Sequence, residues 1–307
     1  MKRALAVVVL VCSPAWAQPA GPTVQERLGH PASARLLVIN ADDLGMAHSV
    51  NRATFEALEK GWVGSASVLV PCPWFPEVAR FARAHPEVEL GIHLALNSEW
   101  TSFRWGPLSS VDVVPSLLDE TGYLPLLEEM VAKKADPAQA ERELRAQIER
   151  AKSAGLRVSH LDTHMGTLFH TAALFDVYRR LAAEYGLPLR VDRVAQLPPG
   201  ASVPEGEVLL DQVVSMEPGV DAAGWRAAYE KMLAPLPPGV YELVVHLAYD
   251  DEEMRGATSD HPNWGAAWRQ QDRDLLASQG FRDFLRAQGF VLVDWRTLAG
   301  ARRPPAR

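Results

Sequence analysis

Short runs of apolar and β-branched residues alternate with longer stretches of helical period along most of this chain. The first pair shows the pattern: residues 36–40 read Leu-Leu-Val-Ile-Asn, and an amphipathic stretch follows at 49–60. The apolar runs lack a clean polar alternation, which is typical of parallel strands that are covered on both faces. Strands and helices that take turns in this way build βαβ units. The alternation therefore restricts the chain to the α/β class.

The same pattern continues to the end of the chain and defines the expected elements. The expected strands span residues 36–40, 67–70, 89–95, 158–161, 189–191, 208–210, 241–247 and 290–293. The expected helices span 49–60, 75–84, 174–184, 222–233 and 268–287, with one more from Pro137 to a stop at Gly155. We therefore predict a single-domain, irregular (β/α) barrel of seven to eight strands, in preference to an open doubly wound sheet.

The two ends of the chain lie outside this pattern. Lys2 and Arg3 precede a short apolar run and an Ala-Trp-Ala sequence, so residues 1–17 are expected to be a signal peptide. Residues 18–34 form an irregular lead-in, 35–300 the barrel and 301–307 a tail. No later stretch has the roughly 20 apolar residues that crossing a bilayer requires, so we expect no membrane span. The mature protein should be exported, to the periplasm or the medium.

Charge and cysteine content exclude several classes of function. The chain has 31 Lys+Arg against 38 Asp+Glu, a formal net charge of −7, so it offers no overall attraction to a nucleic-acid backbone. Its two cysteines, Cys12 and Cys72, form neither a disulfide framework nor a cysteine-rich zinc site. A metal site in this chain must use histidine and carboxylate ligands.

Ionisable residues follow four of the expected strands at the ends that meet on one face of a (β/α) barrel. They are Asp42 and Asp43, His93, Asp162 and His164, and His246. Two histidines and a carboxylate suit a divalent ion such as Zn²⁺, which lowers the pKa of bound water toward 7. A second carboxylate could act as general base and another histidine as general acid. These are the parts of a metal-dependent amide or ester hydrolase.

Each residue also has a simpler structural interpretation. Asp42 and Asp43 could form an Asx-turn and cap the next helix, His93 could be a core histidine, and His164 could be a loop histidine held by Asp162. The arrival of such residues on four separate strands favours the functional interpretation.

Three segments resemble the signature segments of the YdjC/ChbG-like carbohydrate deacetylases, relatives of the polysaccharide deacetylases. They are residues 40–45 (Asn-Ala-Asp-Asp-Leu-Gly), 91–94 (Gly-Ile-His-Leu) and 160–164 (His-Leu-Asp-Thr-His). The resemblance covers residues 35–298, with the three motifs in family order. It implies an irregular (β/α) barrel that removes acetyl groups from N-acetylated sugars with the help of a divalent metal ion.

The motifs also imply roles for single residues. By this resemblance Asp43, His93 and His164 bind the metal ion, zinc or magnesium, and Asp42 is the general base. His246 matches a late histidine that acts as acid or contacts substrate. The His-Pro pair that usually marks this histidine occurs later in this chain, at His261, so either histidine could fill the role.

The expected substrate is a mono- or oligosaccharide with an N-acetyl or O-acetyl group. Trp100, Trp105 and Trp264 are candidates for stacking on sugar rings, with core packing as the alternative. Arg190 is a candidate for binding an acyl or anionic group, with a structural ion pair as the alternative. The first two tryptophans lie within residues 97–134, which we expect to be a long insertion over one face of the barrel. A homodimer is compatible with the sequence.

Two other functions remain open at this level. One is a metal-free glycoside hydrolase with two carboxylates on opposite sides of the scissile bond. Adjacent Asp42 and Asp43 do not supply that arrangement alone, so Asp162 or Asp250 would have to be the partner. The other is a non-catalytic periplasmic glycan-binding protein.

Overall fold

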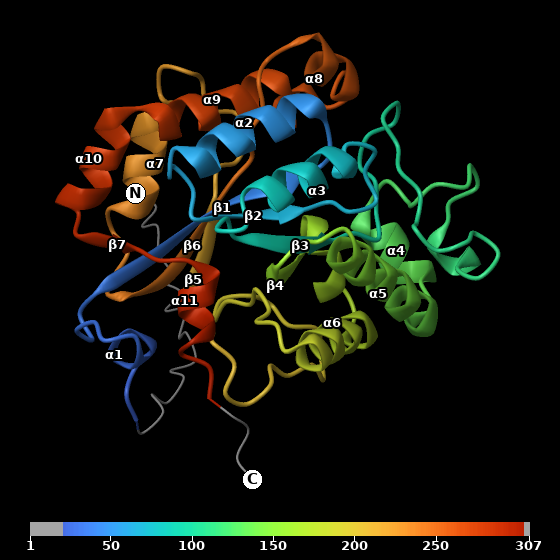
Figure 1. Cartoon of the computed structure of the whole chain (residues 1–307), viewed down its shortest axis with the longest axis horizontal. Coiled ribbons are helices and arrows are strands. Elements are labelled where there is room, and N and C mark those ends of the chain that lie inside the picture. Colours follow the sequence, from blue (N-terminus) through green and yellow to red (C-terminus); the bar gives the residue numbers. More distant parts are fainter. Residues whose placement is uncertain (1–20, 304–307) are drawn as a thin grey trace, which may run out of the picture.

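The computed structural model describes residues 21–303 and is built around parallel strands flanked by helices (Figure 1). The strands in this range are β1 (Arg35–Leu44), β2 (Ser65–Val68), β3 (Leu90–Leu94), β4 (Val158–Thr163), β5 (Gln212–Ser215), β6 (Gly239–Val245) and β7 (Phe290–Leu292). Every pair of neighbouring strands is parallel. The predicted α/β class is confirmed.

Backbone pairing runs through the sheet in the order β4-β3-β2-β1-β6-β5, and β7 pairs with the first residues of β1. Two isolated parallel bridges continue this path from β4 back toward β5. Leu161 pairs with Leu189, and Asp192 pairs with Leu210, two residues before β5 begins. The pairing therefore closes into an irregular barrel. The strands expected at 189–191 and 208–210 contribute only these bridges, which is why the barrel is irregular.

Helices occupy the outside of the strands. The α-helices are α1 (Val24–Arg27), α2 (His48–Glu59), α3 (Phe75–Ala84), α4 (Glu128–Lys134), α5 (Pro137–Ser153), α6 (Ala172–Tyr185), α7 (Trp225–Leu233), α8 (Glu252–Ala257), α9 (Ala266–Ala277), α10 (Gln279–Ala287) and α11 (Trp295–Ala299). Three 3₁₀ turns are η1 (Pro115–Leu117), η2 (His164–Phe169) and η3 (Pro262–Trp264). In Figure 1, α2, α3 and α9 lie above the strands, whereas α5 and α6 lie below them.

The central strand β1 is buried over its whole length after Arg35. Its neighbours on both sides, and the helices outside them, remove its apolar side chains from water, which stabilises the fold by about 25 cal/mol for each Å² of apolar surface buried. The same burial covers the C-terminal end of β1, where Asp42 and Asp43 lie. The fold thus places two carboxylates in its interior, and each needs a partner there.

The prediction of one helix over residues 268–287 was wrong, because Ser278 has extended backbone angles (φ −74°, ψ 131°) and separates α9 from α10. The Ser278 hydroxyl accepts a hydrogen bond from the backbone N–H of Phe281 and so caps α10. Apolar periodicity alone does not reveal such a break, since buried residues occur on both sides of it, at Leu275 and Leu276 in α9 and at Phe281 and Leu285 in α10.

Residues 97–134 are mostly irregular, with only η1 and α4 as regular elements, and they project at one side of the barrel (Figure 1). The lead-in contains the short helix α1. The signal peptide expected at 1–17 lies outside the described residues, as does most of the tail. None of the helices described between residues 21 and 303 combines the length and apolar character needed to cross a membrane.

Candidate metal and hydrolase site

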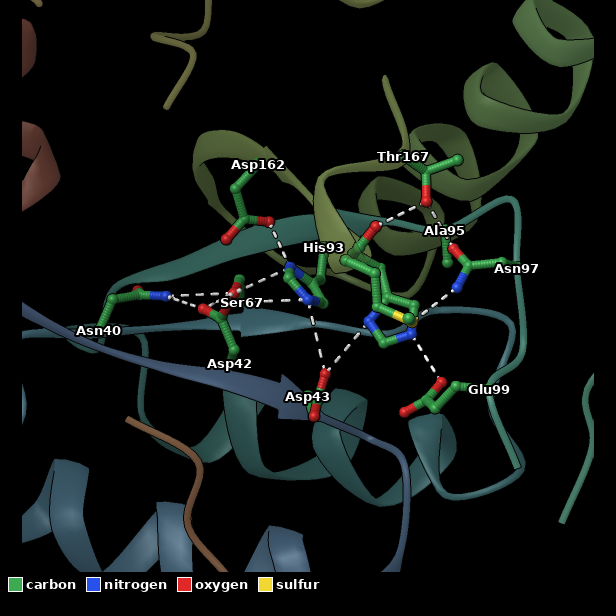
Figure 2. A network of polar contacts seen from close by, with 12 residues as sticks. Asn40, Asp42, Asp43, Ser67, His93, Ala95, Asn97, Glu99, Asp162 and Thr167 are labelled. Atoms are coloured by element: carbon green, nitrogen blue, oxygen red, sulfur yellow. Dashed lines mark hydrogen bonds and ion pairs between the residues drawn. The ribbon is translucent and has the colours of Figure 1, made fainter. Parts of the chain in front are cut away.

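Three side chains from three strands converge at the C-terminal end of the barrel (Figure 2). Asp43 lies in β1, His93 in β3, and His164 directly after β4. Asp43 Oδ1 is 3.5 Å from His93 Nε2 and 3.4 Å from His164 Nδ1. All three residues are at most 3% exposed. The structure thus brings together the three residues that the motifs suggested as metal ligands.

An irregularity in β1 explains how Asp42 and Asp43 both reach this site. Consecutive residues of a regular strand point to opposite faces. In β1 the pairing with β2 shifts between Ala41 and Leu44, and Asp43 has a left-handed backbone with φ 67°. Both carboxylates therefore lie near one imidazole, with Asp42 Oδ2 3.7 Å from His93 Nε2. Neither caps α2, whose N-cap is Ala47.

Each histidine of the cluster holds a carboxylate on its other ring nitrogen. His93 Nδ1 is 2.8 Å from Asp162 Oδ1, and His164 Nε2 is 2.7 Å from Glu99 Oε2. Metal-binding histidines almost always have such a partner, because it fixes the tautomer and the ring orientation. The interpretation of His164 as a loop histidine held by Asp162 was wrong, because Asp162 contacts His93 instead.

The cluster has the chemistry of a cation site. Asp43 Oδ1 is buried and has no hydrogen-bond partner in the described part of the chain. Such an oxygen is costly to bury unless a charged partner faces it. Together with His93 Nε2 and His164 Nδ1, it offers one oxygen and two nitrogen ligands, a set that suits zinc and related divalent ions.

The charges of the cluster also favour a bound cation. Burial raises the pKa of Asp43, but Arg269 and His164 outweigh it and hold that pKa well below its usual range. Burial lowers the pKa of His164, but the carboxylates of Glu99 and Asp43 outweigh it and raise that pKa to about 10. The carboxylates therefore favour positive charge at this position, which a proton on His164 supplies and a metal ion could supply instead.

Asp42 is held by three donors. Its Oδ1 accepts hydrogen bonds from Asn40 Nδ2 at 2.7 Å and from Ser67 Oγ at 2.9 Å. Arg190 Nη1 lies 3.1 Å from both oxygens of Asp42. Oδ2 is thus the less occupied oxygen, and it is the one nearer His93. The carboxylate is fixed with one oxygen toward the cluster.

Arg190 forms a buried structural ion pair, the alternative that its sequence left open. Its Nη1 is also 3.1 Å from Asp162 Oδ2 and 3.6 Å from Glu242 Oε1. Burial and the neighbouring carboxylates raise the pKa of Glu242 to about 8, so this third carboxyl group is protonated at neutral pH. Arg190 therefore balances Asp42 and Asp162 inside the barrel, and its Nη1 faces carboxylates.

His246 is the first residue after β6 and lies on the same side of the barrel as the cluster. Its backbone N–H donates to Asp272 Oδ2 at 3.0 Å, and its Nδ1 is buried without a partner among the described residues. Burial lowers its pKa to about 4, although Asp43 opposes this. The imidazole is therefore neutral at pH 7. His261, by contrast, is exposed at the start of η3.

The three tryptophans considered for sugar stacking differ in burial. Trp100 and Trp105 are only 1% and 2% exposed, whereas Trp264 is 36% exposed. Trp105 packs at 5.8 Å from the His164 ring, and Trp100 lies 5.9 Å from the Arg269 guanidinium. Trp105 thus packs against the cluster and Trp100 against Arg269, both from within the protein. Trp264 alone among the three presents substantial surface to solvent.

Two charged residues that contact the expected metal ligands, Glu99 and Arg269, were not predicted from the sequence. Glu99 lies in the irregular segment after β3, and Arg269 lies in α9, where its Nη2 is 2.8 Å from Asp43 Oδ2. Neither stands at the end of a strand, and neither has a spacing that marks it. The sequence carried no local signal for them.

Comparisons with known proteins identify the family of this chain. A family model described as YdjC-like protein matches residues 36–287. The carbohydrate deacetylase of Thermus thermophilus is 37% identical over 283 residues, which cover 90% of this chain and 98% of that protein. The carbohydrate deacetylase of Thermoanaerobacter pseudethanolicus is 27% identical, covering 86% and 99%.

A solved structure from Enterococcus faecalis V583, whose description names a candidate cellobiose-phosphate cleavage protein, has a TM-score of 0.71 to this fold. It is 25% identical and covers 87% of this chain and 99% of its own. The protein is thus an irregular (β/α) barrel with a buried histidine–carboxylate cluster at the C-terminal ends of its strands. The chain belongs to the YdjC-like family.

Proposed function

We propose that this protein is a metal-dependent hydrolase that removes an acetyl group from an N-acetylated, or alternatively O-acetylated, saccharide. The observation that carries the proposal is the convergence of Asp43, His93 and His164, with a carboxylate on the second nitrogen of each histidine. The relatives named carbohydrate deacetylase support the substrate class.

Asp43, His93 and His164 would hold the ion. When bound, a divalent ion polarises a carbonyl oxygen and lowers the pKa of bound water toward 7. Imidazole ligands suit zinc, whereas magnesium prefers oxygen ligands, so zinc is the first ion to test and magnesium the second.

Asp42 is the group that we assign as general base. Asn40, Ser67 and Arg190 fix its position, and they leave Oδ2 as the less occupied oxygen. This oxygen lies 3.7 Å from His93 Nε2, the nitrogen that faces Asp43. It is therefore placed to accept a proton from a water molecule that attacks the acetyl carbonyl carbon.

His246 is the group that we assign to protonate the leaving amine. Its Nδ1 has no competing partner in the described chain, and Asp272 fixes its backbone. Because its pKa is lowered to about 4, the imidazole is neutral at pH 7 and must first take up a proton. In this proposal that proton is the one that Asp42 removes from the attacking water, and His246 passes it to the departing amine as the C–N bond breaks.

Product analysis tests this function against the alternatives. Mature protein loaded with Zn²⁺ or Mg²⁺ is incubated with a panel of N-acetylated and O-acetylated sugars, and both acetate and new reducing ends are measured. We expect acetate release that a chelator abolishes and that added metal restores. Release of reducing ends without acetate would instead support a glycoside hydrolase, and tight sugar binding without product would support a glycan-binding protein.

We also propose that the enzyme acts outside the cytoplasm, which rests on the sequence of residues 1–17. Expression with its native N-terminus and N-terminal sequencing of the exported fraction test this location. The expected first residue is Gln18, and an uncleaved chain in the cytoplasmic fraction would contradict it.

A further inference from the structure

The irregular stretch that follows β3, residues 97–99, lies against His164, although Glu99 and His164 are 65 positions apart in the sequence. Glu99 Oε2 is 2.7 Å from His164 Nε2, and the two side chains are only 14% and 4% exposed. The opposite ring nitrogen, Nδ1, is the one that faces Asp43. Each ring nitrogen of His164 therefore faces a carboxylate, Nδ1 that of Asp43 and Nε2 that of Glu99.

A second contact holds the same stretch to the backbone around His164. Thr167 Oγ1 is 2.7 Å from Asn97 Oδ1 and 2.9 Å from the carbonyl oxygen of His164. Asn97 Nδ2 is 2.8 Å from Met165 Sδ. Residues 97–99 and 164–167 are thus joined by three side-chain contacts, one of which Figure 2 shows between Asn97 and Thr167.

The backbone next to His164 needs such support. Met165 has φ 50°, a left-handed conformation that non-glycine residues rarely adopt. Among the residues the structure describes, Asp43 is the only other non-glycine residue with a positive φ. Strained residues of this kind persist where the surroundings over-determine them, and they cluster at functional sites.

The two histidines are supported from different parts of the molecule. Asp162, the partner of His93, lies in β4 within the barrel. Glu99 lies in the segment 97–134, and residues 97–99 are fastened there by two hydrogen bonds: Ser98 N–H donates to the carbonyl of Pro125, and Trp105 N–H donates to Ser98 Oγ. The orientation of His164 therefore depends on the segment that projects from the barrel.

We propose that Glu99 is a positioning residue of the metal site, which keeps the proton of His164 on Nε2 and so presents the Nδ1 lone pair to the ion. Through Glu99, the folded state of residues 97–134 sets how tightly the metal is held. This inference rests on the proposed metal site and adds a residue that acts through His164 without touching substrate.

Metal titration of the purified mature protein tests the proposal. Wild type, Glu99→Ala, Glu99→Gln and the control Glu120→Gln are titrated with Zn²⁺ in competition with a chelator, and with Co²⁺ followed by its visible absorption. Glu120 is an exposed carboxylate of the same segment. We expect Glu99→Ala to weaken Zn²⁺ binding by about 10- to 100-fold and to change the Co²⁺ spectrum.

The variants separate positioning from other roles. Glu99→Gln should lose less affinity than Glu99→Ala, because its amide oxygen can still accept a hydrogen bond from Nε2–H, and Glu120→Gln should match wild type. If Glu99→Ala does not fold, Glu99→Gln should still show weaker Zn²⁺ binding and a changed Co²⁺ spectrum, with both changes smaller than those expected for Glu99→Ala.

Three results would overturn the proposal. Folded Glu99 variants with wild-type metal affinity would show that Glu99 does not position His164. Wild-type metal affinity combined with lost acetate release would place Glu99 in direct contact with substrate. A wild-type protein that binds neither Zn²⁺ nor Co²⁺ would refute the proposed function itself, a result distinct from the first two.

Discussion

Arg269 Nη2 lies 2.8 Å from Asp43 Oδ2, and both side chains are almost completely buried, at 3% and 2% exposure. This ion pair occupies one oxygen of Asp43 and leaves Oδ1 facing His93 and His164. Arg269 therefore fixes which oxygen of Asp43 is offered to a metal ion. It also neutralises Asp43 in a site that water barely reaches.

Replacing Arg269 should destabilise the metal-free protein more than the metal-loaded protein. Removal of one partner of a buried ion pair costs about 3–5 kcal/mol, because the remaining charge is left uncompensated. In the Arg269→Met variant, a bound metal ion would still neutralise part of the negative charge of Asp43. Urea unfolding of wild type and variant, with and without Zn²⁺, measures the two losses. Equal losses in both states would show that Arg269 and the ion do not share Asp43.

Asp42→Asn should separate catalysis from metal binding. The amide keeps the size of the carboxylate but cannot take a proton from water, and general bases contribute about 10²- to 10⁴-fold to rate. We therefore expect acetate release to fall at least about 100-fold while metal content stays at the wild-type level. Loss of the metal from this variant would instead make Asp42 a ligand.

Gly91 is required by a close approach between strands, and Gly91→Ala should destabilise the fold. A Cβ at this position would lie 2.3 Å from Cε1 of His160, whose ring also stacks on Trp295 at 4.7 Å between centroids. Because the ring is packed on one side by Trp295, overpacking should cost about 1–3 kcal/mol or more. Gly256→Ala, where nothing lies within 4 Å of the new Cβ, is the control and should be neutral or slightly stabilising. Equal thermal stability of the two variants would contradict this account.

Glu89 gives the stability of the fold a predictable pH dependence. Burial and the nearby Asp294 raise its pKa from 4.5 to about 7, although the backbone N–H groups of Trp295 and Arg296 oppose this. Between these pH values the unfolded chain has lost the proton of Glu89 and the folded protein has kept it. The Glu89 contribution to the free energy of unfolding therefore falls as the pH rises from about 4.5 to 7.

Glu89→Gln isolates this contribution, because an amide does not titrate in this range and one oxygen can still accept a hydrogen bond from α11. We expect wild type to lose stability relative to the variant between pH 5 and pH 8, as measured by urea unfolding at each pH. A constant difference between the two proteins over this range would refute the assignment.

Much of the site could be predicted because its residues stand at the ends of parallel strands. Asp43, His93 and His164 are far apart in sequence, but the carboxyl ends of β1, β3 and β4 meet on one face of a barrel whatever the details of the loops. The alternation of apolar runs and helical stretches was sufficient to place them there. The sequence alone is therefore enough to place a residue at the end of a predicted strand on this face of the barrel.

The roles of Glu99 and Arg269 could not be predicted, because neither residue lies at the end of a strand. Their positions relative to the site are set by tertiary packing. Glu99 lies in a segment whose path depends on contacts such as that between Ser98 and Pro125, and Arg269 depends on how α9 packs. The burial of Trp100 and Trp105 has the same origin, since a tryptophan in an irregular segment is exposed or buried according to tertiary contacts alone.

The metal content of the purified mature protein decides whether Asp43, His93 and His164 form a metal site. Wild type and the double variant His93→Ala/His164→Ala are reconstituted with Zn²⁺ or Mg²⁺, freed of excess ion, and analysed by mass spectrometry for bound metal. We expect close to one equivalent of metal in wild type and loss of that metal in the double variant. No bound metal in reconstituted wild type, or the same content in both proteins, would contradict it.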